Sequence, residues 1–540
     1  MLVCATGAAR FQNGFVYDDV PVIVEGSLIH EPSRLVDAWT AHTMVASASD
    51  PGAVQSVDTY RPMPITTFAL DATISGRQPW AFHSSNLLLH LVCSLLVMFL
   101  GITWLGTEHR PEAFYGAAVF AVHPWLVEAH GWINGRSDPL ALMFGLLAVC
   151  ALVGRERRPR RGMSALAAAL FLLGLLSKET LITLVPAVLL MPVAHGQQVG
   201  WRERLSGRLP PLLLASGIYL AARAAVLGGA QTHRDAAMLH EASLRLPWLL
   251  LDGLRQMLVP TQPYLRSLRD EYALVPVWQS ALALGVLVVL GLLALRHRRE
   301  APLAAPSLAW MLLPLVPIAI LTTVLWPGFG RYLYLPAAGL AWALADGASR
   351  LRGRVRPAVR AALAVVHIAV LSALAVGFLQ DFRDDETLYR AAILARPEIA
   401  VGHGWLGMSR SEARPRDAVL PLRMAVSLDP DTARYRLFLA RSQLASGDRE
   451  GSHQTALDGI SRHAGSREAA AFHLAAVNAL PRHDPRRAVG HLLGCLEAWP
   501  DRPDCVAALD SLLERDIAGE HCAHALALGR LPEFVRPRCE

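Results

Sequence analysis

The chain has 540 residues, of which 53% are hydrophobic and only 18% are charged, and its formal net charge is +6. A soluble protein of this size needs more charged surface, so this composition excludes an entirely soluble globular protein. The basic residues stand in short clusters between apolar runs, which indicates membrane topology and argues against a nucleic-acid partner.

The chain begins with a partly apolar stretch, Met1–Gln12, that is too short to cross a bilayer and lacks the basic start of a signal peptide. We assign residues 1–83 to an N-terminal loop, which the arginine-rich loops described below place outside the cytoplasm. Such a loop needs a helix to carry it across the membrane. We therefore expect that a first span, upstream of this loop, is missing from the sequence.

Between residues 84 and 380, uncharged apolar runs alternate with short polar loops. A helix needs about 20 apolar residues to cross a bilayer, so the pattern predicts a transmembrane domain of about ten spans. The six clear runs are Ser84–Trp104, Asp138–Gly154, Pro210–Leu227, Pro276–Leu295, Pro302–Leu325 and Ala361–Gln380. The four shorter runs are Ala113–Val122, Met163–Leu176, Leu181–Ala194 and Tyr332–Ala345. A further segment, Leu246–Pro260, contains Asp252 and Arg255 and is interpreted as interfacial or re-entrant.

Four loops between these runs are rich in arginine: Arg155–Arg161, Trp201–Arg208, Arg296–Glu300 and Arg350–Arg360. Positive loops face the cytoplasm. With the spans in this order, all four loops lie on one face of the membrane. The N-terminal loop, the loops at His123–Ser137 and Ser177–Thr180, and the C-terminal tail then lie on the opposite side.

The tail, residues 381–540, has the composition of a soluble domain. Two sets of residues keep the spacing of the small residues and the proline of a TPR unit: Ala418, Ala425 and Pro430, then Ala488, Cys495 and Pro500. The predicted fold class is therefore all-α, a polytopic transmembrane helix bundle followed by a TPR-like α-solenoid. A generic helical bundle is the alternative for the tail. TPR repeats form a concave groove for peptides, which implies a polypeptide partner.

The tail also holds an even number of cysteines: Cys495, Cys505, Cys522 and Cys539. This number permits one or two disulfides in an oxidising compartment, and free thiols are the alternative. The spacing does not match a zinc site.

Two adjacent acids, Asp18 and Asp19, stand in the N-terminal loop. Carboxylates paired at a membrane surface can act as a general base, orient an acceptor or bind a metal. An Asp-Asp pair is also common in turns, so the pair alone does not decide between these roles.

Several polar residues follow near the first clear span. They are Arg61, His83, Asn86 and His90. Polar side chains in a membrane are costly and point to function. Hydrogen bonding between helices explains Asn86 and His90 equally well.

The densest polar run places His123, Glu128, Arg136 and Asp138 within sixteen residues. An arginine at the bilayer surface can grip a lipid phosphate or pyrophosphate with its planar donors. Further charged and aromatic residues are expected on the same side: Lys178, Glu179, Arg223, Arg331 and Tyr332. Several cations and carboxylates on one face favour a site for an anionic lipid donor, while anchoring at the membrane interface also explains Tyr332.

Six stretches carry a family resemblance in order along the chain: FVYDD (Phe15–Asp19), YRP (Tyr60–Pro62), FHSSNLLLH (Phe82–His90), HPWLVEAHGWINGRSDPLA (His123–Ala141), SKE (Ser177–Glu179) and RYLYLP (Arg331–Pro336). Together with the tail, they resemble the transmembrane-and-TPR-repeat protein O-mannosyltransferases. These belong to the C-type glycosyltransferases, which use polyprenyl-phosphate sugars.

The resemblance implies transfer of a sugar, mannose, from a polyprenyl-phosphate carrier to a Ser or Thr hydroxyl of a polypeptide. The catalytic carboxylate maps onto Asp18 or Asp19, with a slight preference for Asp19. The lipid-phosphate ligands map onto Arg136, Lys178 and Arg331. The residues assigned to the substrate pocket are Arg61, His83, His123, Glu128, Asp138, Glu179, Arg223 and Tyr332. A divalent metal is compatible with this chemistry and is not required.

The sequence departs from the family at Gly330, where an acidic residue is expected before Arg331. Its repeat array is also short. The alternative function is therefore a catalytically inactive membrane scaffold that binds polypeptides through its repeats. The arginine- and alanine-rich composition favours a bacterial inner membrane with a periplasmic tail, and the lumen of a eukaryotic endoplasmic reticulum is the alternative.

Overall fold

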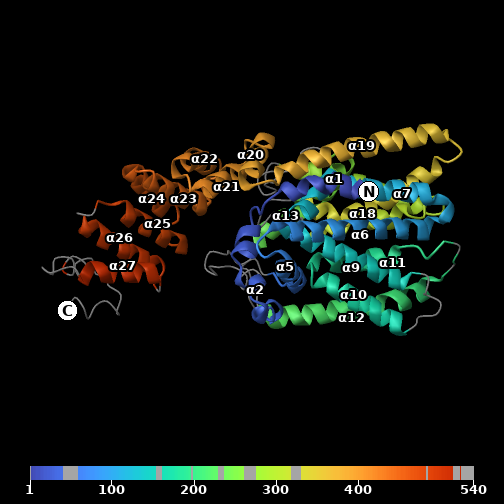
Figure 1. The fold of residues 1–540 in the computed structure, drawn as a ribbon, viewed down its shortest axis with the longest axis horizontal. Helices are drawn as coiled ribbons and strands as arrows, with labels where there is room; N and C mark the ends of the chain where they lie inside the picture. The colour runs from blue at the N-terminus through green and yellow to red at the C-terminus, as the bar shows by residue number, and fades with distance from the viewer. Residues whose placement is uncertain are drawn as a thin grey trace. The chain divides into compact units, whose positions relative to one another are not determined.

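In a computed structural model, the chain divides into two compact units, Met1–Asp384 and Asp385–Glu540 (Figure 1). The residues that the structure describes are 2–40, 59–153, 161–195, 197, 199–228, 236–260, 275–317, 330–481, 484–500, 502–514 and 523. In these ranges the secondary structure is helical and contains no strand. The all-α prediction is confirmed.

Five stretches of the first unit are long and apolar enough to cross a membrane. They are α6 (Pro79–Leu105), Ile133–Leu152 with α9 (Ser137–Leu152), α12 (Trp201–Leu227), α15 (Val277–Arg296) and α19 (Pro357–Asp381). Apolar side chains cover the outer faces of α6, α12, α15 and α19, whereas Ile133–Leu152 is mostly buried; Leu282 of α15 and Leu363 of α19 are 63% and 64% exposed. Such a surface is unfavourable in water and suits lipid. The chain is therefore a multi-span helical membrane protein.

The other five predicted spans coincide with shorter helices. These are α7 (Arg110–Val122), α10 (Arg161–Leu175), η7 (Glu179–Leu184) with α11 (Val185–Leu190), α16 (Ala304–Leu312) and α18 (Tyr334–Arg350). The predicted run Pro302–Leu325 leaves the described residues after Pro317. The segment predicted to be interfacial, Leu246–Pro260, begins inside α13 (Ala236–Leu258) and ends two residues after it.

The centre of the first unit is formed by α6, α7, α9 and α18, of which α6, α7 and α18 lie side by side in Figure 1. Gly116 of α7 permits this contact, because a Cβ there would collide with the carbonyl oxygen of Ala341 in α18. The Trp342 ring packs edge-on against Trp104 and Trp310, with centroids 4.9 and 5.1 Å away. This packing holds α18 between α6 and α16.

Arginines gather at the end of the bundle where α7 and α19 begin and α18 ends. Arg352 and Arg360 each approach the buried Glu112 carboxylate of α7 to 3.1 Å, and Arg350 binds Asp346 at 2.7 Å. The opposite end of α7 and α18 is built from short helical segments, and this is where the candidate site lies.

The segments at or near that end belong to many parts of the chain. They are α1 (Leu2–Gly7), η1 (Ala8–Gln12), η2 (Val20–Val24), α2 (Ser27–His30), η3 (Pro32–Arg34), α3 (Asp37–Thr40), α5 (Pro62–Ser75), η5 (Pro124–Leu126), α8 (Val127–Gly131), η6 (Ile133–Arg136) and η8 (Gly330–Leu333). One more short segment, η4 (Thr107–His109), precedes α7.

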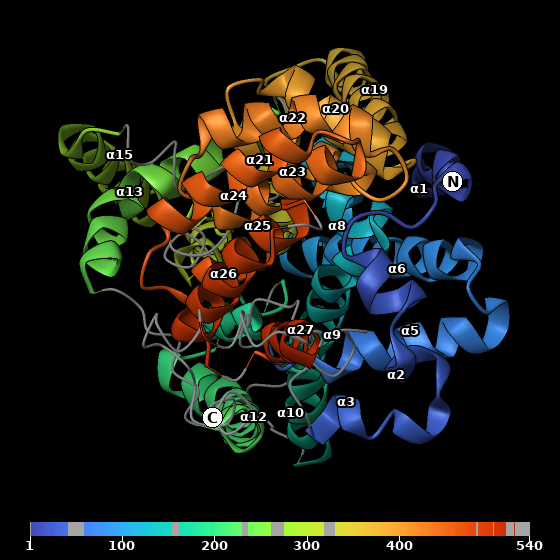
Figure 2. The ribbon, with the colours of Figure 1, turned by 90° about the vertical axis from the view of Figure 1, so that its left-hand side faces the viewer.

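The described part of the second unit is a row of helices. It contains α20 (Asp385–Ala395), α21 (Ala400–Arg410), α22 (Pro415–Leu428), α23 (Ala433–Ala445), α24 (Arg449–Arg462), α25 (Arg467–Ala479), α26 (Pro485–Ala498) and α27 (Pro503–Glu514). Consecutive helices pack together, α21 also contacts α23 and α23 contacts α25, and Figure 2 shows α21 to α26 as one stack. The repeat positions Ala418, Ala425 and Cys495 are fully buried. This arrangement agrees with the predicted α-solenoid.

A disulfide between Cys495 and Cys505 joins α26 to α27. Cys522 and Cys539 lie outside the described residues. In the first unit, Cys93 and Cys150 are free thiols. The tail therefore uses one of the disulfides that its cysteine count permits.

Candidate active site

The first element of the site is a bidentate ion pair between Arg61, which caps α5, and Glu179, which begins η7. The Arg61 Nε and Nη2 atoms donate to the two Glu179 oxygens at 2.8 and 2.6 Å. Burial by itself would raise the pKa of Glu179, but the Arg61 guanidinium outweighs it and lowers that pKa to about 2. The pair is therefore fully charged at neutral pH.

The second element is the ion pair between Lys178 and Asp138, in which both side chains are only 3% exposed. Lys178 Nζ donates to both Asp138 oxygens, at 2.6 and 2.7 Å, and stands 4.9 Å from the Tyr332 ring centroid. Burial lowers the pKa of Lys178 to about 8, and repulsion from Arg61 and Arg331 acts in the same direction, while Asp138 opposes it. An additional anion would relieve this repulsion.

The third element joins Arg331 of η8 to Glu128 of α8. Glu128 accepts a hydrogen bond from the Arg331 backbone N–H at 3.3 Å, and its other oxygen lies 3.9 Å from Arg331 Nε. The Arg331 guanidinium lies over the Trp132 ring at 4.6 Å and beside Tyr332 at 5.5 Å. Burial raises the pKa of Glu128 to about 7, against the attraction of Arg331.

Glu128→Gln should change how stability depends on pH. The pKa of this carboxyl is about 4.5 in the unfolded chain and about 7 in the folded chain. Protonated Glu128 therefore stabilises the folded chain below pH 4.5, and this stabilisation is lost as the pH rises through about 7. The free energy of unfolding contributed by Glu128 changes by about 3 kcal/mol over this pH range. Thermal unfolding at a series of pH values between these two pKa values and above measures it. The Tm of the parent should fall relative to that of the variant as the pH rises, and an equal difference at every pH would contradict a buried Glu128.

Gly330 explains how η8 reaches α8. A Cβ at Gly330 would lie 2.8 Å from Trp125 Cε3 and 3.4 Å from a Glu128 oxygen. The acidic residue that the family resemblance leads us to expect would not fit here without a shift of Trp125. Glu128 holds its carboxylate beside this glycine instead.

These three pairs form one ion-pair cluster. Lys178 is adjacent to Glu179, Tyr332 contacts both Lys178 and Arg331, and Asp138 acts electrostatically on Glu128. Predicted site residues that meet in it are Arg61, Glu128, Asp138, Lys178, Glu179, Arg331 and Tyr332. Arg223 lies at its edge, because the Tyr219 hydroxyl feels the charges of Arg223, Arg61 and Glu179.

The two adjacent acids occupy different surroundings. Asp19 is fully buried, and its oxygens accept hydrogen bonds from the backbone N–H groups of Val16 at 3.1 Å and Asn134 at 2.8 Å. Asp18 is only partly buried. Tyr17, just before them, has a φ of 54°, an uncommon conformation for a residue with a side chain, and its ring contacts Trp132 at 5.6 Å. Trp132 thus connects the acidic loop to Arg331.

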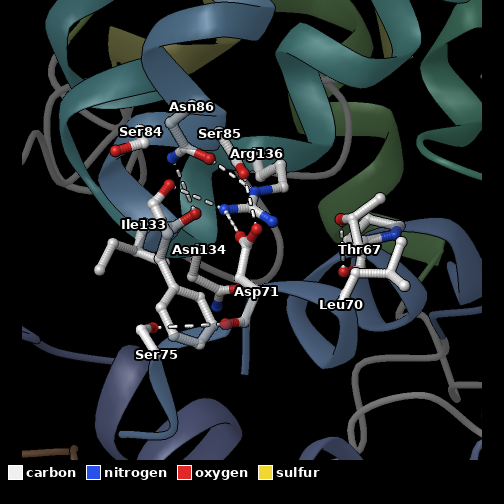
Figure 3. Close-up of polar contacts among 12 residues, drawn as sticks. Thr67, Leu70, Asp71, Ser75, Ser84, Ser85, Asn86, Ile133, Asn134 and Arg136 are labelled. Atoms are coloured by element: carbon white, nitrogen blue, oxygen red, sulfur yellow. Dashed lines mark hydrogen bonds and ion pairs between the residues drawn. The ribbon is translucent and has the colours of Figure 1, made fainter. Parts of the chain in front are cut away.

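Arg136 stands apart from the ion-pair cluster. Its guanidinium is fully buried and binds Asp71 of α5 at 2.5 Å, Asn86 at 2.6 Å and the Phe82 carbonyl at 2.8 Å (Figure 3). The Phe68 ring covers it at 4.5 Å. This arrangement joins α5, α6 and η6.

The two predicted histidines also lie outside the ion-pair cluster. His83 donates through Nε2 to the Asn13 carbonyl at 3.2 Å, and His123 donates to the Met257 carbonyl of α13 at 2.9 Å. Both are buried. Within the residues that the structure describes, no three His, Cys, Asp or Glu side chains are arranged to hold a metal ion.

Sequence reasoning missed Asp71, Trp132 and Tyr219. Asp71 could have been identified from the sequence, because it is a lone carboxylate in an otherwise uncharged helix. Trp132 and Tyr219 carried none, because an aromatic residue in an apolar segment is expected from membrane packing alone.

Curated proteins match this chain, whereas no family profile and no solved structure does. Protein O-mannosyl-transferase TMTC1 of Homo sapiens is 33% identical over 145 residues, which is 27% of this chain and 16% of that protein. Protein O-mannosyl-transferase Tmtc2 of Drosophila melanogaster is 33% identical over 190 residues, 34% of this chain and 20% of that protein. This chain has homologues in the TMTC family.

A third TMTC-type relative, Protein O-mannosyl-transferase F38B6.6 of Caenorhabditis elegans, is 29% identical over 186 residues, 34% of this chain and 25% of that protein. The matched stretch spans a quarter or less of the length of each of these three relatives. The family resemblance found from the motifs is confirmed by these TMTC proteins.

Proposed function

We propose that this chain is an integral-membrane glycosyltransferase that moves mannose from a polyprenyl-phosphate carrier to a Ser or Thr hydroxyl of a polypeptide. The observation that carries the proposal is the ion-pair cluster, in which three cations, Arg61, Lys178 and Arg331, meet at one end of the bundle beside the acidic loop. The names of the TMTC relatives agree with it.

The three cations provide a site for the lipid phosphate. A carboxylate binds each of them, so these cations are already charged and oriented before a lipid phosphate enters. Burial strengthens these interactions relative to water. Lys178 and Arg331 would stabilise the charge that develops on the phosphate as the glycosidic bond breaks.

Asp18 is the better candidate for the general base. A base must reach the acceptor hydroxyl, and Asp18 is partly exposed, whereas Asp19 is buried with both oxygens bound by backbone N–H groups. In the proposed step, Asp18 takes the hydroxyl proton, the oxygen forms a bond to the anomeric carbon with inversion, and polyprenyl phosphate leaves. Asp19 shapes the loop, and Arg136, bound to Asp71, supports it.

We place the site on the non-cytoplasmic side of the membrane. It lies at the end of α18 opposite to Arg350, and arginine-rich loops favour the cytoplasm. The Cys495–Cys505 disulfide suits an oxidising compartment, which agrees with a tail on the same side. That compartment is the periplasm in a bacterial host, which the composition favours, and the lumen in a eukaryotic one. The stacked helices of the tail would bind the acceptor polypeptide.

The test is transfer of radiolabelled mannose from polyprenyl phosphate to Ser- and Thr-containing peptides by the full chain in lipid nanodiscs. We expect the peptide to become labelled, and we expect alkaline β-elimination to release the label from it. Arg331→Met should lower this transfer, and Arg350→Met is the matched control, because it lies at the other end of α18 and binds Asp346. Peptide binding with no transfer from any mannose or glucose donor would overturn the proposal and favour the scaffold function.

A further inference from the structure

The η6 turn, Ile133–Arg136, is held from several directions by polar contacts. Asn86 of α6 donates to the carbonyls of Trp132 and Ile133, both at 3.1 Å, and Arg136 ends the turn (Figure 3). The middle of the turn offers the Asn134 N–H to Asp19 at 2.8 Å. In addition, the Trp132 indole donates to the Val16 carbonyl at 3.2 Å. The acidic loop is therefore docked onto this turn.

Asp71 holds the charged end of the turn. It comes from α5, is 4% exposed, and accepts a hydrogen bond from Ser85 at 2.6 Å while it pairs with Arg136. Figure 3 shows the Asp71 carboxylate facing the Arg136 guanidinium, with Ser85 close by. Ser85 fixes the direction in which this carboxylate faces.

Arg136 lies within electrostatic reach of two buried carboxylates, Asp71 and Asp19. Its Nη1 atom finds no hydrogen-bond partner among the described residues. A buried guanidinium with an unused donor will turn to the nearest available carboxylate if its partner loses its charge. The other carboxylate whose charge acts on Arg136 is that of Asp19.

We propose that Asp71 is a positioning residue that keeps the Arg136 guanidinium away from Asp19. Asp19 then remains bound to the backbone N–H groups of Val16 and Asn134, and the acidic loop keeps its shape. Since Asp18 is next to Asp19, the same arrangement sets the direction of the proposed base. This catalytic consequence rests on the proposed function, whereas the structural role of Asp71 does not.

Asp71→Asn tests the proposal in the full chain, with two measurements. Hydrogen–deuterium exchange of the segments that contain Val16 and Asn134 should become at least fivefold faster, because Asp19 leaves their N–H groups. The kcat for mannose transfer should fall at least tenfold, with the KM for the donor within twofold, because the donor phosphate binds elsewhere. Asp71→Glu, which keeps the charge, should recover part of both.

Asp252→Asn is the matched control. Asp252 is also buried and bound to an arginine, Arg255, but lies on α13. The Asp252→Asn variant should exchange hydrogen at Val16 and Asn134, and transfer mannose, at the rates of the parent. If Asp71→Asn does not yield folded protein, Ser85→Ala loosens Asp71 more gently and should accelerate exchange at Val16 and Asn134 about twofold.

The outcomes separate the two proposals. Unchanged exchange in both Asp71→Asn and Ser85→Ala overturns the role of Asp71, whatever the activity. Equal exchange rates in Asp71→Asn and Asp252→Asn do the same. A parent chain that transfers no sugar contradicts the proposed function, and the exchange measurement still decides the role of Asp71.

Discussion

Asp18→Asn should lower the kcat for mannose transfer by about 10²–10⁴-fold, the range that a general base contributes. The Tm should stay at the parent value, because Asp18 is only partly buried and asparagine has the same shape. Transfer from polyprenyl-phosphate mannose to a Ser/Thr peptide, measured with saturating donor, gives kcat directly. Parent-level kcat in this variant would contradict Asp18 as the base.

Asp19→Asn is the comparison that separates the two acids. Its amide would place an NH2 group against one of the backbone donors of Val16 and Asn134. Hydrogen bonds to a charged group contribute about 1.5–3 kcal/mol each, so the free energy of unfolding should fall by about that amount. A large loss of kcat with unchanged stability in Asp19→Asn would instead assign the base to Asp19.

Lys178→Met should be strongly destabilising. It leaves the Asp138 carboxylate buried without its cation, and breaking a buried pair in this way costs about 3–5 kcal/mol. Chemical unfolding of the variant in detergent, followed by tryptophan fluorescence, measures this loss. An unchanged unfolding midpoint would contradict a desolvated Lys178–Asp138 pair.

The double variant Lys178→Met/Asp138→Leu separates stability from function. Replacing both partners of a buried ion pair by apolar groups is often close to neutral, so the free energy of unfolding should return to near that of the parent. Mannose transfer should remain at least 10²-fold below the parent, because a cation for the lipid phosphate is still absent. Recovery of transfer together with stability would show that the pair has only a structural role.

Much of the fold could be predicted from local pattern. Apolar runs such as Ser84–Trp104 and Ala361–Gln380 predicted helices that the structure contains as α6 and α19, because a bilayer demands length and apolarity of each span separately. The repeat spacing of Ala418 and Ala425 predicted buried helix contacts for the same reason, since each repeat packs only against its neighbours.

The surroundings of a helix could not be predicted in this way. The run Tyr332–Ala345 predicts a short span, whereas α18 extends to Arg350 with most of its residues buried among α6, α7 and α16. Hydropathy does not distinguish a helix that faces lipid from one that faces other helices. Only the packing partners of α18 decide this.

The candidate site shows the same division. The residue types of Arg61, Lys178, Glu179 and Arg331 predicted a charged outer face, but their pairing followed from contacts between distant segments. Arg61 and Arg331 bind carboxylates more than a hundred residues away, and Lys178 binds Asp138 from 40 residues away. Arg136 has the residue type of a phosphate ligand. The lone acid Asp71, from another helix, binds it and makes it part of the support for the acidic loop.

The amino-acid sequence alone is enough to identify a multi-span helical membrane protein with a helical-repeat tail, related to the TMTC proteins. These properties depend on composition, period and motif order, which are local. Tertiary contacts set which carboxylate faces which cation, bury Asp19 while Asp18 stays partly exposed, and hold Arg136 apart from Lys178 and Arg331. Those properties depend on how distant segments pack, because a buried charge is set by the partners that folding brings to it.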